Sequence, residues 1–258
     1  MIFTTAGRPT EALVREAERL SHLHKGTYIP REKRSISHLM NLCDEPLIVV
    51  GFDRLFLYKN HAEKPVFFHP NSAMFRTKAL LRGGSDAFIQ ASGLKKGMSL
   101  LDCTAGLGAD SIVASLVVGE AGSVQAIEGS DHALILQEGL KNWQSGEAKI
   151  DDAMRRVVVI GKRYEAVLPN LPDDSVDVVY FDPMFEDTIL ESDGVLEMKK
   201  IALYDALSEE MIKEAKRIAR IRVVLKDSWK SSQFQKFGFQ QQIRKTSKFH
   251  YGILECEE

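Results

Sequence analysis

Short apolar runs alternate with amphipathic stretches through most of the 258-residue chain. Continuous apolar runs bounded by turn residues are typical of buried parallel strands, and apolar positions three to four residues apart are typical of the helices that cover such strands. This alternation predicts an α/β fold with a doubly wound, mostly parallel sheet. The predicted strands are 99–103, 124–128, 157–160, 175–181 and 221–225, followed by an antiparallel closing pair at 237–246 and 250–255.

Helices are expected between these strands, at 111–118, 130–143 and 206–219. The segment 72–92, which precedes the first of the strands, is also expected to be helical, with an interruption at Gly83-Gly84.

The first seventy residues follow a different pattern. Residues 1–5 are expected to form a strand, residues 10–24 an amphipathic helix, and the runs 47–52 and 55–58 a hairpin. We therefore predict a small basic α+β N-terminal domain at residues 1–70 and a larger domain at residues 71–258.

Charge is unevenly distributed along the chain, although the net charge is only −2. Residues 1–100 contain 15 Lys and Arg against 9 Asp and Glu, whereas the remainder contains 19 against 27. A basic front half favours contact with a polyanion, with Arg8, Arg31 and Arg34 as candidate contacts to a nucleic-acid backbone. Solvated surface charges without any partner explain the same composition equally well.

Neither membrane insertion nor metal binding is indicated. The chain has no apolar run long enough to cross a bilayer and no signal-peptide pattern at its start. Its three cysteines are far apart and form no Cys-x-x-Cys pair, which favours unpaired thiols in a reducing cytoplasm. We expect a cytoplasmic protein without a metal site.

Residues 99–110 read Ser-Leu-Leu-Asp-Cys-Thr-Ala-Gly-Leu-Gly-Ala-Asp, which predicts a strand, a glycine turn and a helix. Gly106 and Gly108 allow a tight turn close to a ligand, and the helix presents free N–H groups there. The next strand ends at Glu128, twenty residues beyond Gly108, where a ribose diol is commonly bound. These linked signals predict a nucleotide-like pocket; packing of the three elements for structural reasons alone is the alternative. Ser111 replaces the third glycine of a dinucleotide fingerprint, which disfavours a nicotinamide cofactor.

The pattern Asp102-x-x-x-Gly106-x-Gly108 together with Glu128 resembles the first motif and the acidic end of the second strand in class I S-adenosylmethionine-dependent methyltransferases. The resemblance implies a Rossmann-like sheet whose last strand is antiparallel. It also implies S-adenosylmethionine as cofactor and S-adenosylhomocysteine as product. The cofactor-binding residues that it implies are Asp102, Thr104, Ala105, Gly106, Gly108, Asp110, Glu128, Gly129 and Asp182. The segment before the first strand often lines the methionine end of this cofactor, with Arg76, Lys78, Arg82 and Asp86 as candidates; ordinary surface charges on a connecting helix are the alternative.

Asp182-Pro183-Met184-Phe185 follow the fourth strand of the predicted sheet, at the edge where open α/β sheets bind ligands. The sequence resembles the Asp-Pro-Pro-Tyr motif of methyltransferases that act on exocyclic amino groups of bases. Such an amine is a poor nucleophile because its lone pair is delocalised into the ring. The Asp182 carboxylate and the Pro183 carbonyl would accept its hydrogens and direct the lone pair at the methyl group, and Phe185 would stack on the base. A strand that simply ends in a polar turn is the alternative.

Both motifs together resemble the ribosomal small-subunit RNA methyltransferase J family, which methylates the N2 amine of a guanine, over about residues 66–185. Two features depart from that family: Ala109 replaces a basic residue, and Glu186-Asp187 replace a basic stretch. Thr4-Thr5-Ala-Gly-Arg-Pro and Phe68-His-Pro-Asn resemble a Gram-positive branch of the same superfamily.

The function expected from this resemblance is methyl transfer to an exocyclic amino group of a base in structured, ribosomal RNA, with RNA as the partner. A methyltransferase that acts on DNA or a small molecule is one alternative. A catalytically silent fold that binds RNA or a protein is another, although the presence of both Asp182 and Phe185 argues against it. The oligomeric state stays open.

Overall fold

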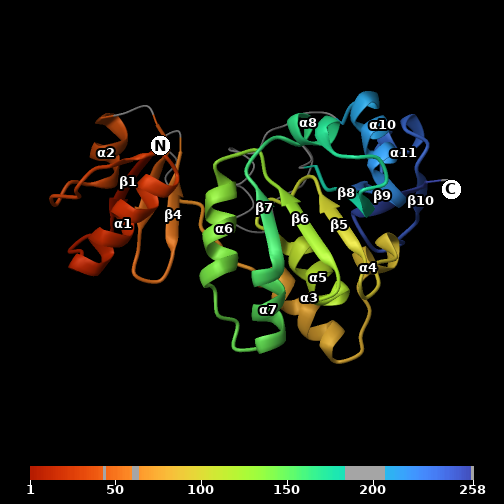
Figure 1. The fold of residues 1–258 in the computed structure, drawn as a ribbon, viewed down its shortest axis with the longest axis horizontal. Coiled ribbons are helices and arrows are strands. Elements are labelled where there is room, and N and C mark those ends of the chain that lie inside the picture. The colour runs from red at the N-terminus through yellow and green to blue at the C-terminus, as the bar shows by residue number, and fades with distance from the viewer. Residues whose placement is uncertain (43–44, 60–63, 184–206, 257–258) are drawn as a thin grey trace. The chain divides into compact units, whose positions relative to one another are not determined.

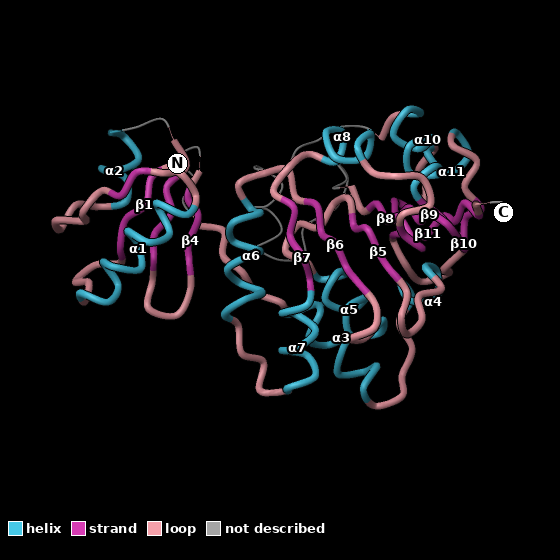
Figure 2. Tube along the Cα trace, in the orientation of Figure 1, coloured by secondary structure: helices cyan, strands magenta, loops and turns pink. Residues whose placement is uncertain are grey.

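The computed structural model describes residues 1–42, 45–59, 64–183 and 207–256, and it divides into two compact units. Among the described residues, unit 1 comprises 1–69 and unit 2 comprises 70–183 and 207–256. Figures 1 and 2 show the helices and strands of each unit. No helix among these residues combines the length and the apolar character that crossing a bilayer requires.

Unit 1 is built on a four-stranded sheet in the order β2-β1-β3-β4. β1 (Ile2–Thr5) is parallel to β2 (Thr27–Tyr28) and β3 (Leu47–Val50), and β3 pairs antiparallel with β4 (Leu55–Tyr58). α1 (Glu11–Leu23) begins at Thr10, whose hydroxyl accepts a hydrogen bond from Leu13 N, and it buries Leu13, Ala17 and Leu20. α2 (Ile36–Leu42), which the sequence pattern did not predict, buries Leu39 and Met40.

Unit 2 contains a seven-stranded sheet in the order β10-β11-β9-β8-β5-β6-β7. β5, β6, β7, β8 and β9 are parallel, while β11 is antiparallel to its neighbours β9 and β10. This arrangement confirms the Rossmann-like class predicted from the sequence. The strands are β5 (Ser99–Asp102), β6 (Ser123–Ile127), β7 (Val157–Ile160), β8 (Val176–Phe181), β9 (Ala219–Ser228), β10 (Gln240–Gln242) and β11 (Phe249–Glu255).

Helices cover both faces of this sheet, as the alternation of side chains along β8 shows. Val179 and Phe181 belong to a buried cluster with α10, whereas the ring of Tyr180 lies 4.5 Å from that of Phe88 on α4. Figure 1 shows α5 and α10 on different sides of the strands. The helices are α3 (Asn71–Leu81), α4 (Ala87–Ser92), α5 (Ala109–Val118), α6 (His132–Asn142), α7 (Ala148–Arg156), α8 (Tyr164–Val167), the 3-10 turn Leu168–Asn170, α10 (Glu209–Ile218) and α11 (Gln233–Lys236).

The two edges of the parallel strands carry different polar groups. At the amino edge, the Asp177 carboxylate accepts hydrogen bonds from Ser99 N (2.7 Å), Ser99 Oγ (2.9 Å) and Arg220 Nε (2.8 Å). Although burial opposes it, these donors lower the pKa of Asp177. One carboxylate thus joins β5, β8 and β9 at their starts. The carboxyl ends of these strands meet at the opposite edge, which is where open α/β sheets bind ligands.

Asp177→Ala is expected to lower the free energy of unfolding of unit 2 by about 1–3 kcal/mol, because three donors lose their acceptor. Urea denaturation followed by tryptophan fluorescence measures this effect, since both Trp143 and Trp229 lie in unit 2. Asp173→Ala is the control: the Asp173 side chain is 73% exposed in its pair with Arg217, and its removal should cost less than about 1 kcal/mol. Equal losses in the two variants would contradict the assignment.

Candidate active site

The first motif forms a tight turn between β5 and α5. Gly106 and Gly108 have φ values of +55° and +75°, in the left-handed region that favours glycine. A Cβ on Gly108 would lie 2.7 Å from Leu136 Cδ1, so a larger residue would need this side chain to move. The turn therefore delivers the chain to the start of α5 at Ala109, two residues earlier than the sequence predicted.

The buried Asp102 carboxylate stabilises this turn through hydrogen bonds. Its Oδ1 accepts a hydrogen bond from Thr104 N (3.1 Å) and its Oδ2 accepts one from Ser111 Oγ (2.6 Å). Burial raises the pKa of Asp102 to about 7, and the negative charge of Asp110 adds to the rise, while the Ser111 hydroxyl opposes it. Both oxygens of Asp102 thus have donors within the turn and the first helical turn that follows.

Glu128 brings the second strand of the motif to the same turn. Its Oε2 accepts a hydrogen bond from Gly106 N (2.9 Å), and its Oε1 accepts from Ser130 N (2.9 Å) and Ser130 Oγ (2.6 Å). The carboxylate is half-buried and Gly129 beside it is exposed. The structure therefore brings Glu128 and the glycine turn together, as the paired spacing in the sequence suggested.

Asp182 lies directly beyond the end of β8 and is tied to the first motif. Its backbone N–H donates to Thr104 Oγ1 over 2.6 Å, and its Oδ2 accepts a hydrogen bond from Lys226 Nζ over 2.5 Å. Pro183 follows and is half-buried. Met184 and Phe185, the other two residues of the second motif, lie outside the described residues.

Lys226 is a site residue that the sequence patterns did not identify. It lies near the end of β9, and its Nζ is 3.8 Å from Asp110 Oδ2 as well as bonded to Asp182. The parallel register of β8 and β9 explains the contact. Phe181 pairs with Leu225, so the residues that follow them, Asp182 and Lys226, lie side by side. Neighbouring polar residues at the ends of adjacent apolar strands would have predicted the contact.

Arg76 joins α3 to the site. Its guanidinium donates to Asp86 Oδ2 (2.7 Å) and Oδ1 (2.9 Å) and to Asp110 Oδ1 (2.5 Å). Asp110 Oδ2 accepts a further hydrogen bond from Tyr180 Oη over 2.9 Å. Of the candidates from the segment before β5, Arg76 and Asp86 are thus brought to the site, whereas Lys78 and Arg82 are exposed.

The charges of this cluster determine which groups are ionised. Burial raises the pKa of Asp182 to about 6, although the Lys226 ammonium opposes the shift. Burial alone would raise the pKa of Asp110 too, but Lys226 and Arg76 hold it below its usual value. Despite burial, the carboxylates of Asp182 and Asp110 raise the pKa of Lys226, which keeps this side chain protonated. At neutral pH the site therefore holds ionised Asp110 and Asp182 against two cations.

The three candidate arginines of the N-terminal region lie in unit 1. Arg8 is exposed with a φ of +56°. Arg31 Nε donates to the carbonyl of Arg34 (2.5 Å), and Arg34 Nη2 donates to the carbonyl of Pro30 (2.9 Å) and to Glu32 (2.6 Å). Arg31 and Arg34 thus use some of their N–H groups in hydrogen bonds within their own loop.

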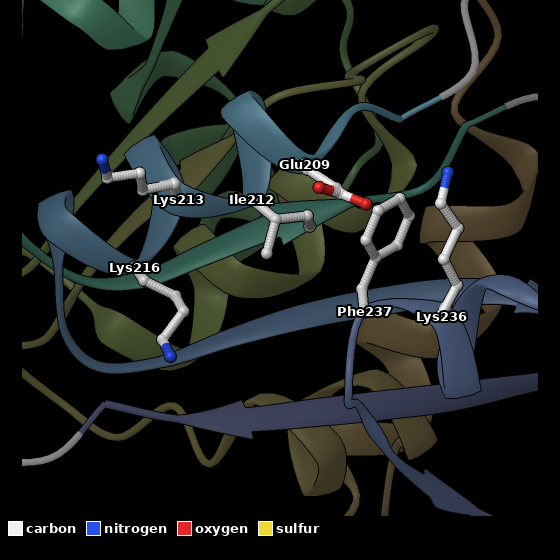
Figure 3. Close-up of a pocket in the computed structure, with 6 residues that line it drawn as sticks. All are labelled: Glu209, Ile212, Lys213, Lys216, Lys236 and Phe237. Carbon is white, nitrogen blue, oxygen red and sulfur yellow. The ribbon is translucent and has the colours of Figure 1, made fainter.

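A shallow groove of about 410 Å³ lies elsewhere on unit 2, between α10 and the end of α11 (Figure 3). None of the described residues of the two motifs lines it. It is lined by Glu209, Ile212, Lys213, Lys216, Lys236 and Phe237.

The chain belongs to the family described as "Putative SAM-dependent methyltransferase", whose model matches residues 36–251. The fold, the glycine turn and the acidic end of β6 agree with this membership. The protein is a methyltransferase that depends on S-adenosylmethionine (SAM), as the resemblance of the motifs implied.

Three comparisons illustrate the relationship. The chain is 43% identical to "Uncharacterized protein YpiP" of Bacillus subtilis over 256 residues, which cover 98% of this chain and 99% of that protein. It is 29% identical to ribosomal RNA small subunit methyltransferase J of Buchnera aphidicola over 150 residues, 55% of this chain and 58% of that protein. The crystal structure of a SAM-dependent methyltransferase from Neisseria gonorrhoeae has the same fold, with a TM-score of 0.61 and 17% identity over 99% of this chain and 96% of that one.

Proposed function

We propose that the protein transfers the methyl group of SAM to an exocyclic amino group of a base in structured RNA, specifically ribosomal RNA. The observation that carries the proposal is the Asp182 carboxylate, held at the carboxyl edge of the sheet and tied to the glycine turn through Thr104. The relative from Buchnera aphidicola, a ribosomal RNA small subunit methyltransferase J with 29% identity to this chain, supports ribosomal RNA as the substrate.

The donor set around the glycine turn fits the cofactor. The Glu128 carboxylate is suited to ribose hydroxyls. Oε2 accepts one hydrogen bond, from Gly106 N, and has a second lone pair free, whereas Oε1 accepts two from Ser130 and would receive a second hydroxyl when the Ser130 side chain rotates away. The first turn of α5 adds N–H groups that have no partner within the helix. Gly106, Gly108 and Gly129 would let the backbone come close to the ligand. When bound, SAM supplies an electrophilic methyl group on a sulfonium.

Asp182 would act on the amine. Lys226 occupies Oδ2, and among the described residues Oδ1 has no donor, so Oδ1 can accept an N–H of the base. This hydrogen bond favours localisation of the nitrogen lone pair toward the methyl group. Nitrogen would become positively charged as the N–CH3 bond forms and the S–CH3 bond of the sulfonium breaks, leaving S-adenosylhomocysteine, and it would then lose a proton. A carboxylate with a pKa of about 6 would stabilise that charge and could accept the proton. The Pro183 carbonyl is the proposed second acceptor, and Phe185 the proposed stacking partner.

Arg8, Arg31 and Arg34 of unit 1 are the proposed contacts to the nucleic-acid backbone from the N-terminal region. Their positive charge is available to phosphates even where individual N–H groups are used within the loop.

Comparison of nucleosides from ribosomal RNA of strains with and without the gene, by mass spectrometry, tests the function directly. We expect one methylated nucleoside to disappear in the deletion strain and to return with the wild-type gene. An unchanged set of methylated nucleosides in ribosomal RNA would contradict the proposed substrate.

Asp182→Asn is expected to lower turnover at least about a hundredfold, because the amide replaces a preorganised anionic group that stabilises charge developing on the amine. SAM affinity, measured by calorimetry, should change little. Asp173→Asn, the same exchange at an exposed position, is the control and should retain activity. A fully active Asp182→Asn enzyme would show that the acceptor lies elsewhere.

The rate of methyl transfer should fall as the pH decreases through about 6, because a protonated Asp182 loses its charge and part of its acceptor capacity. In Lys226→Met, this fall in rate should begin at higher pH, since the ammonium lowers the pKa of Asp182 in the wild-type protein. Single-turnover rates across the pH range measure the fall in rate in both enzymes, with Lys213→Met at the separate groove as control. If the rate of Lys226→Met fell at the same pH as the wild-type rate, Asp182 would be excluded as the group that titrates.

Glu128→Ala should weaken SAM binding by about 1–3 kcal/mol, because two hydroxyls lose their common acceptor. Ser130→Ala is the matched control, since it removes a local donor to the same carboxylate and leaves the carboxylate in place. Isothermal calorimetry gives both affinities. Equal affinities of Glu128→Ala and the wild-type protein would place the ribose elsewhere.

A further inference from the structure

Residues 228–254 contain five Lys or Arg and no Asp or Glu. This segment stands out because residues 101–258 as a whole carry 27 acidic against 19 basic residues. A basic segment of this length within an acidic half of the chain is a local feature that the average charge conceals. Its basic residues are Lys230, Lys236, Arg244, Lys245 and Lys248.

Part of this segment gathers at the carboxyl end of β9. Trp229 N donates to the Lys248 carbonyl (3.1 Å), and Gln241 Nε2 donates to the Trp229 carbonyl (3.0 Å). These bonds hold Trp229, directly after β9, against the β10–β11 hairpin, whose turn contains Arg244 and Lys245. Because β9 is parallel to β8, its end lies at the same sheet edge as Asp182.

Aromatic rings connect this region to the active site. Lys226 Nζ, which bonds Asp182, lies 4.8 Å from the centroid of the Phe249 ring. Arg244 Cζ lies 5.0 Å from the same centroid and 5.7 Å from that of Tyr251. The Arg244 guanidinium and the active-site lysine thus share one aromatic neighbour.

Arg244 has an unused donor in this position. Its Nη1 is buried and has no hydrogen-bond partner among the described residues. A buried donor without an acceptor is unfavourable, and a planar guanidinium is suited to two oxygens of one phosphate. Because Nη1 is enclosed by protein, a phosphate is expected to bind Arg244 through its positive charge and its other nitrogens.

Trp229 adds a surface suited to a base. The residue is 50% exposed, and Lys230 Nζ lies 4.9 Å from its ring centroid. Exposed aromatic rings next to cations are typical of surfaces on which the bases of single-stranded nucleic acid stack while lysines contact the backbone. Lys245, on the hairpin turn, is also exposed.

We propose that Trp229, Lys230, Arg244 and Lys245, here called the hairpin surface, bind the RNA substrate beside its target base. Arg244, Lys230 and Lys245 contact the sugar–phosphate backbone, and Trp229 stacks on a neighbouring base. The proposal rests on the proposed function, and it assigns RNA binding to unit 2 itself in addition to the arginines of unit 1.

Binding of a fluorescein-labelled RNA stem–loop to the full chain, followed by anisotropy at several salt concentrations, tests the hairpin surface. The principal variant is Lys230→Glu with Lys245→Glu, two exposed positions. Its matched control is Lys141→Glu with Lys149→Glu, two exposed lysines on α6 and α7 that make the same change in net charge. Arg244→Met tests the guanidinium while retaining an apolar stem over Phe249, and Trp229→Ala tests stacking.

The hairpin variant should lose at least about tenfold in affinity, and its salt dependence should become shallower by about 1.5 to 2 in log–log slope, as expected when two phosphate contacts are lost. Arg244→Met and Trp229→Ala should each weaken binding measurably. The control should stay near wild type, and SAM binding by calorimetry should be unchanged in every variant, which shows that the fold is intact.

Equal losses in the hairpin variant and the control would overturn the hairpin surface, because overall charge alone would then explain binding. If such a variant also methylated ribosomal RNA normally, the hairpin surface would fail while the proposed function stood. Absence of RNA binding by a wild-type protein that binds SAM, together with unchanged nucleosides in the deletion strain, would overturn both. Tighter binding of the matching DNA stem–loop would overturn the assignment to RNA.

Discussion

Repulsion among buried carboxylates is the constraint on which the candidate active site depends. Asp102, Asp110 and Asp182 lie at the carboxyl edge of one sheet, and each raises the energy of charging another. Like charges in a buried region are tolerated only when cations or hydrogen-bond donors compensate for them. Arg76 and Lys226 do so here, and they come from α3 and β9, on either side of the motifs in the sequence. The electrostatics of the site are therefore complete only once the whole sheet has assembled.

The parts of the site that follow from local sequence could be predicted, because their geometry depends on neighbouring residues. A strand, two glycines and a helix define the turn between β5 and α5 wherever that unit occurs. The spacing to Glu128 reflects a single crossover, and the structure duly bonds its carboxylate to Gly106 N. Lys226 could not be found in this way, since its importance arises from the pairing of β8 with β9, which are separated by a long connection.

The differences between predicted and observed elements also have physical causes. α7 (Ala148–Arg156) was not predicted because charged residues dominate it, yet it buries Ile150, Ala153 and Met154 on one face. α2 is short, and its two buried residues form too brief a pattern to indicate a helix. The charge balance of large parts of the chain hid a local feature: averaging over residues 101–258 concealed an acid-free segment that runs from the end of β9 into β11. Charge acts over the Debye length, so local clusters matter more than totals.

The three carboxyl groups illustrate how one sheet edge produces different chemistry from the same functional group. Asp102 receives Thr104 N and Ser111 Oγ, which commits both of its oxygens to the turn. Both oxygens of Asp110 are likewise taken, by Arg76 and Tyr180, and its two cations keep it ionised.

Asp182 differs from both because only one of its oxygens has a partner among the described residues, and that partner is a cation. Lys226 has two opposed effects on this group. It keeps the Asp182 carboxylate ionised near neutral pH, and it occupies one of the two acceptors that the proposed substrate amine could use. An acid held in this balance keeps one free acceptor and a pKa of about 6. Both properties suit the proposed role of Asp182, in which it first positions an amine and then receives its proton.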